Sequence, residues 1–244
     1  MTDALARLRG FRPRLLPTLI AGGGVALLLV LGTWQLVRLV EKRAINGLRA
    51  ERLATPPAKL PARLDDPAAW EFRRVVARGR LDHAHELYLP CRSQHGNDGT
   101  CVIAKLARAE GPPVLVNRGW VPPSRKDPAR RPAGDASEVE LIGVLRVAAQ
   151  RTWAMPDNDP AKNVWFWWDP PAMARAAGAG EAASFYLEAA LDPTAPEGAP
   201  IGGQTREQLP DNHLGYAFTG YALAIALAAI SVLSETQTPT EPRQ

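Results

Sequence analysis

The chain has 244 residues, 46% of them hydrophobic, and a formal net charge of +4. Because its mean hydropathy is slightly negative, the composition excludes a transporter with many membrane spans, while two long uncharged segments exclude a plain soluble domain. The basic residues form no dense tract interleaved with aromatics, so we do not expect nucleic acid as a partner.

The first uncharged segment covers residues 15–37 and predicts a transmembrane helix. At about 1.5 Å per residue it is long enough to cross a hydrocarbon core of about 30 Å. It exceeds the apolar stretch of about 7 to 15 residues in a signal peptide, and the charged residue Arg38 follows it in place of a cleavage site, so we expect an uncleaved anchor. The residues before it carry several arginines, which predicts a cytoplasmic amino terminus over residues 1–14.

Good helix formers continue to Leu53, so the first helix is expected to leave the membrane and to end before Pro56 and Pro57. Short strand-like segments follow, separated by turn residues that include glycine and proline pairs. They cover residues 70–81, 85–89, 101–107, 114–120, 139–147 and 184–190. A short helix is predicted over residues 170–177, and the strands predict a small antiparallel sheet or barrel within one domain, residues 38–213.

The second uncharged segment, residues 214–233, predicts a second span, followed by a cytoplasmic tail over residues 234–244. Small residues form a stripe on this helix, and His213 begins the same stripe; the stripe contains Ala217, Gly220, Ala224 and Ala228. The first span also carries glycines, so we expect the two helices to pack through small faces. This packing places His213 level with Trp34, Gln35 and Arg38.

These elements predict an α+β membrane protein in which two transmembrane helices flank a mainly antiparallel β domain outside the cytoplasm. The segment before the first span is shorter and poorer in serine than a mitochondrial transit peptide. We therefore favour the bacterial inner membrane as the location, with the main domain in the periplasm and the lipid bilayer as a partner.

Two other groups of residues are candidates for chemistry. His83 and His85 lie two apart on one strand face, near His95 and the two cysteines, so a copper or zinc site is conceivable, although the spacing matches no established metal signature and surface histidines are commoner. Cys91 and Cys101 leave a disulfide open: a two-residue turn at residues 97–98 does not pair them, and direct pairing requires a three-residue turn.

Two aromatic segments stand out within the domain, residues 115–122 and residues 163–169. The first is a buried-looking strand that ends at an Arg-Gly-Trp corner, and the second is a run of aromatics before an acidic residue. Their structural interpretation is a sheet edge with an aromatic lid. Because the sequence contains no nucleophile elbow, Walker loop, HExxH or GxGxxG motif, we do not expect an enzyme.

Taken together, motifs along nearly the whole chain resemble the surfeit locus protein 1 family, whose members are assembly factors for haem-copper cytochrome oxidase. The resemblance begins with the Leu-Gly-Thr-Trp-Gln-Leu segment and Arg38 at the end of the first span. It continues with residues 116–122, Gly143, Arg146, Asn158, Pro160, Asn163, Trp165, Asp169, residues 212–214, Tyr216, Ala217 and Thr219. Two positions depart from the family pattern: Asp211 replaces a frequent asparagine, and Gly220 replaces a common aromatic residue.

The resemblance implies a protein that binds haem a transiently and helps to insert it into, or stabilise it in, oxidase subunit I, with haem a synthase as a further partner. It also implies that His213 is the ligand to the haem iron. The position of His213 near a helix amino terminus favours the neutral imidazole that iron requires, and Trp34, Arg38 and Tyr216 complete the expected haem contacts. The alternatives are a membrane scaffold that stabilises an assembly intermediate without binding haem, and a membrane-anchored redox or metal enzyme that uses the His83 region.

Overall fold

The computed structural model describes residues 14–93, 95–134 and 137–236, which form two compact units. One unit combines Met1–Gly47 with Leu209–Gln244, and the other is Leu48–Gln208. Apart from their innermost residues, the predicted cytoplasmic segments 1–14 and 234–244 lie outside the described residues.

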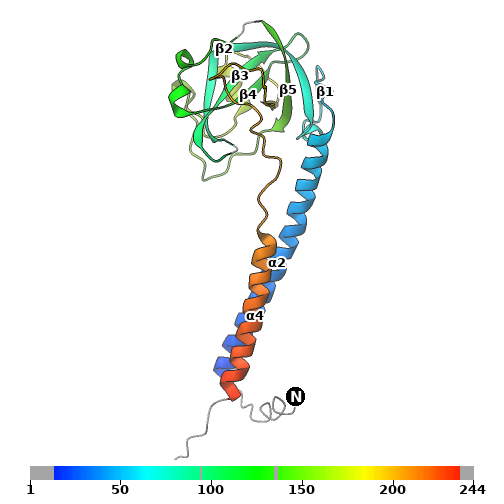
Figure 1. The fold of residues 1–244 in the computed structure, drawn as a ribbon, viewed down its shortest axis with the longest axis vertical. Helices are drawn as coiled ribbons and strands as arrows, with labels where there is room; N and C mark the ends of the chain where they lie inside the picture. The colour runs from blue at the N-terminus through cyan, green and yellow to red at the C-terminus, as the bar shows by residue number, and fades with distance from the viewer. Residues whose placement is uncertain (1–13, 94, 135–136, 237–244) are drawn as a thin grey trace, which may run out of the picture. The chain divides into compact units, whose positions relative to one another are not determined.

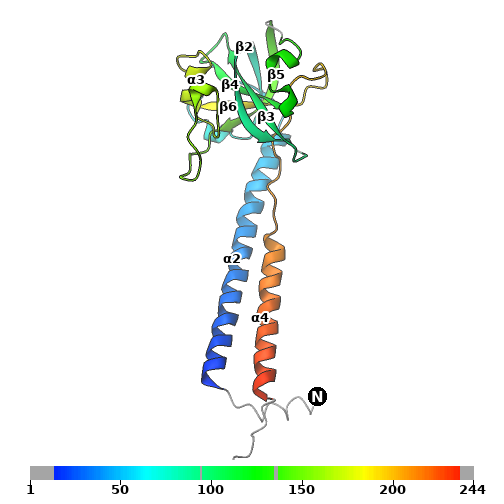
Figure 2. The same ribbon diagram turned by 90° about the vertical axis from the view of Figure 1, so that its left-hand side faces the viewer.

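Two long helices make up the first unit, α2 (Leu15–Ala54, of which residues to Gly47 belong here) and α4 (His213–Thr236). They run side by side (Figure 1 and Figure 2). Both are long and apolar enough to cross a membrane, as the sequence predicts. The extension of α2 beyond the apolar segment is confirmed, and the helix ends just before Pro56 because proline lacks the N–H that a further turn requires.

Small residues form the contact between α2 and α4, also as predicted. Ala217 and Ala224 are buried although most of α4 is exposed. A Cβ atom on Gly220 would lie 3.3 Å from the Cα of Gly32, and a Cβ on Gly32 would lie 3.3 Å from the ring of Tyr221. Gly220 therefore brings the two helix backbones close together.

The second unit is a small barrel made from one mixed, mostly antiparallel sheet (Figure 1). Its strands are β1 (Ala58–Lys59), β2 (Arg74–Arg92), β3 (Asp98–Ala107), β4 (Val114–Val121), β5 (Glu138–Val147) and β6 (Phe185–Ala189). The sheet order is β1-β2-β3-β4-β6-β5, and β2 also pairs with β5, which closes the ring. Strand β5 lies beside β2 in a Greek-key arrangement, and closure leaves few free strand edges.

Short helices fill the connections between the strands. Those of a single turn are η1 (Ala68–Trp70), η2 (Pro123–Arg125), η3 (Pro128–Arg130) and η4 (Pro160–Lys162). The helix α3 (Pro170–Ala176) confirms the helix predicted at this position, and the Asp169 carboxylate caps it by accepting a hydrogen bond from Ala172 N–H.

One strand prediction was wrong. Residues 70–81 and 85–89 were expected to form two strands, but the chain turns through η1 before β2 begins at Arg74 and then runs without a turn to Arg92. The polar residues between Asp82 and Leu87 lie in an irregularity of the pairing with β3. A bulge keeps the strand continuous while letting polar side chains change direction, so they do not mark a loop.

Two hydrophobic layers hold the barrel together. The interior contains residues from every strand of the closed ring, among them Val75, Leu106, Val116, Leu145 and Leu187. A second layer covers the outer face of β2, β3, β4 and β6, where α3 and the fully buried Trp165 pack on side chains of the strands.

The interpretation of the two aromatic segments is half correct. Trp165 closes the outer layer, which confirms an aromatic lid, and Trp168 stacks on Tyr186 with ring centroids 3.6 Å apart. The strand beneath is not an edge, however, because β4 pairs with β3 on one side and with β6 on the other.

Cys91 and Cys101 form a disulfide bond, with Cα atoms 5.7 Å apart. The strand register differs from both turns considered above: Cys91 lies opposite Gly99, and Cys101 lies opposite Leu89. The two cysteines are therefore diagonal neighbours across β2 and β3. The loop that connects these strands, between Arg92 and Asp98, is longer than either turn. Rules for direct cross-strand pairs do not anticipate this geometry.

Candidate functional site

His213 is the first residue of α4, and its imidazole is fixed from two directions. Its backbone N–H donates to Oδ1 of Asp211 at 3.2 Å, which caps the start of the helix. Its ring atom Nδ1 lies 2.7 Å from Oε1 of Gln35 on α2. The ring is half-buried, so one nitrogen is engaged between the helices while the side chain keeps some access to the surroundings.

The segment before α4 is tied to α2 by polar contacts. Asn46 donates from its side-chain amide to the carbonyl of Leu209 at 3.1 Å, and its Oδ1 accepts from Leu209 N–H at 3.0 Å. Arg43 lies 4.0 Å from the Asp211 carboxylate. Further along the helices, the hydroxyls of Thr33 and Tyr221 are 2.9 Å apart. These contacts fix the height and the rotation of α4 against α2.

The other predicted site residues are placed as follows. The guanidinium of Arg38 lies 5.6 Å from the ring centroid of Trp34 and pairs with Glu41 at 2.6 Å. Trp34 remains 47% exposed and Tyr216 is 61% exposed. In the structure, Arg38 thus contacts Trp34, and His213 contacts Gln35. It gives Tyr216 an exposed position one turn into α4.

Sequence reasoning placed Gln35 near His213 but assigned it no role. The available signal was its position at the end of the first span, at the height of a histidine that begins the second. A polar amide at the edge of an apolar helix is expected to find a hydrogen-bonding partner on the neighbouring helix.

The barrel contains a buried charge cluster that the sequence analysis missed. Glu86, whose side chain is 4% exposed, accepts from Arg118 at 2.8 Å and from Arg131, which is also buried. The hydroxyl of Tyr88 donates to the same carboxylate at 3.3 Å. Burial, reinforced by the nearby Glu86 carboxylate, raises the pKa of Tyr88, so its phenol stays neutral.

Two bulges bring this cluster together. Glu86 lies in the irregular stretch of β2, and Arg118 is the extra residue where the pairing of β3 with β4 shifts. The following residue, Gly119, has φ of +128°, and a Cβ there would lie 2.1 Å from the carbonyl oxygen of Ile201. Only glycine fits this backbone, so the Arg-Gly-Trp corner aims Arg118 at Glu86.

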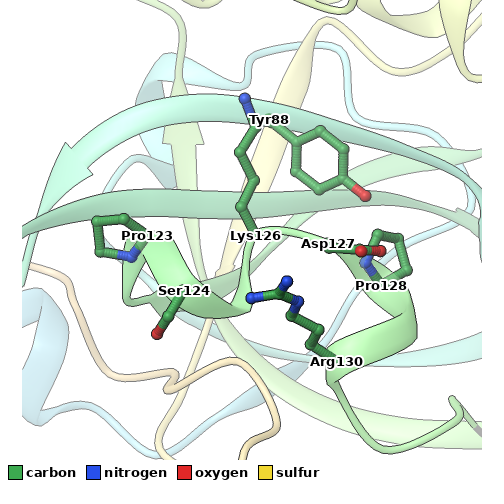
Figure 3. A pocket seen from close by; sticks show the side chains of 7 residues that line it. All are labelled: Tyr88, Pro123, Ser124, Lys126, Asp127, Pro128 and Arg130. Carbon is green, nitrogen blue, oxygen red and sulfur yellow. The ribbon is translucent and has the colours of Figure 1, made fainter.

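A surface pocket of about 380 Å³ shares Tyr88 with this cluster (Figure 3). It is lined by Tyr88, Pro123, Ser124, Lys126, Asp127, Pro128 and Arg130. Lys126 lies 5.7 Å from the centroid of the Tyr88 ring. The Asp127 carboxylate caps η3 by accepting a hydrogen bond from Ala129 N–H. The two cations make the lining suited to anionic groups.

A second ionic cluster surrounds Phe72, which adopts a left-handed backbone with φ of +65°. The guanidinium groups of Arg49 and Arg146 lie 4.1 and 4.6 Å from its ring centroid. Arg146 also pairs with Glu188 at 3.0 Å, and the hydroxyl of Thr205 donates to Glu188 at 2.6 Å. The last turns of α2 and the chain after β6 thus join one network in the barrel unit.

The histidines of the barrel do not converge on a metal site. His83 Nδ1 lies 3.0 Å from Arg118, and His85 Nδ1 lies 3.0 Å from Asp82. Both cysteines are used in the disulfide. In the part of the chain that the structure describes, no group of three or more His, Cys, Asp or Glu residues is arranged to hold a metal ion.

Comparison with known proteins covers most of the chain. The sequence model of the SURF1 family matches residues 23–225. Surfeit locus protein 1 of Homo sapiens is 36% identical over an alignment of 213 residues, which covers 80% of this chain and 70% of that protein. The Mus musculus protein of the same name is 34% identical over an alignment of 212 residues, which covers 80% of this chain and 68% of that protein. A SURF1-like protein of Drosophila melanogaster is 35% identical over an alignment of 214 residues, which covers 80% of this chain and 70% of that protein. The chain therefore belongs to the SURF1 family.

Proposed function

We propose that the chain is a membrane-anchored assembly factor for haem-copper cytochrome oxidase, and that it binds haem a through His213 and aids its insertion into, or stabilisation in, subunit I. The SURF1 family is a family of membrane-bound cytochrome c oxidase assembly factors, which supports the general role. The observation that carries the haem assignment is the placement of the His213 ring, with Nδ1 held by Gln35 and the ring only half-buried.

The residues present fit a haem group. A neutral imidazole with one nitrogen engaged in a hydrogen bond is the usual form of a histidine ligand to haem iron. Trp34, nearly half exposed on the helix that carries Gln35, offers an aromatic surface for the macrocycle. Arg38 beside it offers a cation for a propionate, in competition with Glu41. Tyr216 is exposed on α4 and contributes a ring at the expected membrane surface.

The proposed topology places residues 15–37 and 214–233 in a bacterial inner membrane, with the domain of residues 38–213 in the periplasm. The Cys91–Cys101 disulfide supports this side of the membrane, because disulfides persist in oxidising compartments and are rare in the cytosol. Protease added outside intact spheroplasts should cleave the barrel unit, and protection of that unit would overturn the orientation.

The haem assignment is tested by exchanging the histidine. Full-length protein is purified from cells that synthesise haem a, and its absorption spectrum is compared with those of His213→Ala and of His95→Ala, which removes an exposed histidine of the barrel. We expect the haem bands to be lost from His213→Ala alone. Unchanged haem content in His213→Ala would rule out the ligand role.

The alternative function is a scaffold that stabilises an assembly intermediate without holding haem. Trp153 is 97% exposed and Phe166 is 48% exposed on the barrel unit, and such exposed aromatic side chains are typical of protein contacts, which supports this alternative. Co-purification with subunit I is the discriminating measurement. Recovery of subunit I with haem-free wild-type protein, and equally with His213→Ala, would establish the scaffold in place of the haem carrier.

A further inference from the structure

We propose that Gln35 is a positioning residue that selects the tautomer of His213, holding the proton on Nδ1 and leaving the lone pair of Nε2 free for a metal. The consequence at haem iron rests on the proposed function. The selection of the tautomer concerns the protein alone and can be measured without any ligand.

The hydrogen-bonding atoms determine the tautomer. The side-chain oxygen of Gln35 faces Nδ1 at 2.7 Å, and a carbonyl oxygen can only accept a hydrogen bond. With the amide in this orientation, Nδ1 carries the hydrogen. Because a neutral imidazole carries one N–H, Nε2 is then unprotonated and is the nitrogen that can donate electrons to a metal.

The surrounding contacts hold the two partners at this distance. The Thr33–Tyr221 hydrogen bond fixes the rotation of the helices two residues from Gln35, and the Gly32–Gly220 contact lets the backbones approach. On the other side, the Asn46–Leu209 pair and the cap from Asp211 fix the start of α4. The Gln35–His213 bond thus follows from the packing of the helices rather than from free side-chain motion.

The chemical nature of Gln35 sets the strength of the ligand. A hydrogen bond from Nδ1–H to an acceptor orients the ring and increases the basicity of Nε2. A carboxylate acceptor would draw the proton more strongly than the neutral amide does. An amide therefore gives a preoriented ligand of intermediate strength, which suits a protein that must bind a cofactor and release it to another.

The first experiment reads the tautomer directly. Full-length protein with ¹⁵N-labelled histidine is placed in lipid nanodiscs, and the ring nitrogens are identified by long-range ¹H–¹⁵N correlation; the chain has four histidines, and His213→Ala assigns the signal. We expect the Nδ1–H tautomer in wild type and its loss in Gln35→Leu. The matched control Thr219→Val, which removes a hydrogen bond within α4 to the carbonyl of Gly215, should keep the Nδ1–H tautomer. An Nε2–H signal in wild type, or an unchanged signal in Gln35→Leu with normal helix content, overturns the proposal.

The second experiment reads the haem. Gln35→Leu should weaken haem affinity by about 10- to 100-fold, the usual effect of losing such a hydrogen-bond partner. Gln35→Glu should retain haem and lower its reduction potential, because a more basic ligand favours the oxidised iron. Equal affinity and potential in wild type and Gln35→Leu overturn the role at haem. A wild type that shows the Nδ1–H tautomer but binds no haem instead overturns the proposed function and leaves the tautomer selection in place.

Discussion

The helix pair and the barrel are stabilised in opposite ways. The barrel turns its large apolar side chains inward, as Val75, Leu106 and Leu187 illustrate, whereas the helices turn theirs outward: Leu19 is 70% and Ile225 is 71% exposed. In a bilayer, lipid tails are as apolar as leucine, so helices gain little by burying such residues against each other. Close backbone approach and a few interhelical hydrogen bonds place the helices instead.

The same contrast applies to polar groups. In the barrel, Glu86 is enclosed by Arg118, Arg131 and Tyr88, so its loss leaves other charges unpaired. Between the helices, the Gln35–His213 contact joins an amide to an imidazole. Substitutions in the barrel should therefore affect chiefly folding stability, while substitutions between the helices should affect chiefly the placement of His213.

The largest effect is expected from Glu86→Ala. Because two guanidinium groups lose their buried partner, the free energy of unfolding of the barrel should fall by about 3–5 kcal/mol. Urea unfolding of the full-length protein, followed by tryptophan fluorescence, measures it. As a control, Glu140→Ala breaks the exposed pair with Arg78 and should cost under about 1 kcal/mol. Equal losses of stability in the two variants would show that the buried cluster contributes no more to stability than an exposed ion pair.

Removal of the disulfide should have the next largest effect on the stability of the barrel. The double variant Cys91→Ser with Cys101→Ser opens a link across 10 residues and should destabilise the barrel by about 2–4 kcal/mol. The same unfolding experiment with wild type under reducing conditions should reproduce the loss. A shift in the stability of the helix pair instead of the barrel would contradict the separation of the two units.

A smaller effect is expected for Gly220→Ile, which tests the close contact of the helices. A Cβ at this position would lie 3.3 Å from the Cα of Gly32 and 3.4 Å from the carbonyl oxygen of Leu28, so the helices must separate, at a cost of about 1–3 kcal/mol. Titration with a denaturing detergent, followed by circular dichroism, measures helix stability. Gly215→Ile, where a Cβ meets no atom within 4 Å, is the matched control and should change little.

The smallest effect concerns acid stability of the barrel at Asp82. Partial burial opposes ionisation of this carboxyl, but hydrogen bonds from Lys105 and His85 outweigh burial and lower its pKa from 3.8 to about 2. A folded-state pKa below the unfolded value stabilises the barrel above about pH 4, and this contribution is lost as the pH falls towards 2. Asp82→Asn and Lys105→Met should each flatten this part of the stability profile; unchanged profiles in both would contradict the assignment.

Much of the fold could be predicted from the sequence because long, regular patterns determine it. The two uncharged segments, the small-residue stripe of α4 and the strand at 114–120 all appear as expected. The continuity of β2 could not be predicted, since the polar run from Asp82 to Glu86 resembles a loop and becomes part of a strand only through its pairing with β3. Closure of the barrel likewise depends on pairing between distant segments.

The candidate site was predictable to a similar extent. The small faces of the helices predicted that Gln35 and His213 lie at one height. Their hydrogen bond could not be foreseen, because it depends on the rotation of α4, which Tyr221 and Asn46 help to fix. Glu86 was missed for a different reason: charged residues are rarely buried, and only the two bulges bring its guanidinium partners to it.

The Asn46–Leu209 pair limits the length of chain that is available to reach the start of α4. From Gln35 to Asn46, α2 rises through 11 residues, or about 16 Å. From Leu209 to His213 the chain has four steps and reaches about 14 Å when fully extended, so the side chains of Asn46 and Gln35 must span the rest of the height. The segment from Leu209 to His213 must therefore be almost fully extended. Deleting one residue between positions 209 and 213 must break the contact of either Asn46 or Gln35. One added residue lengthens the segment without breaking either contact, so natural differences in its length should be insertions rather than deletions.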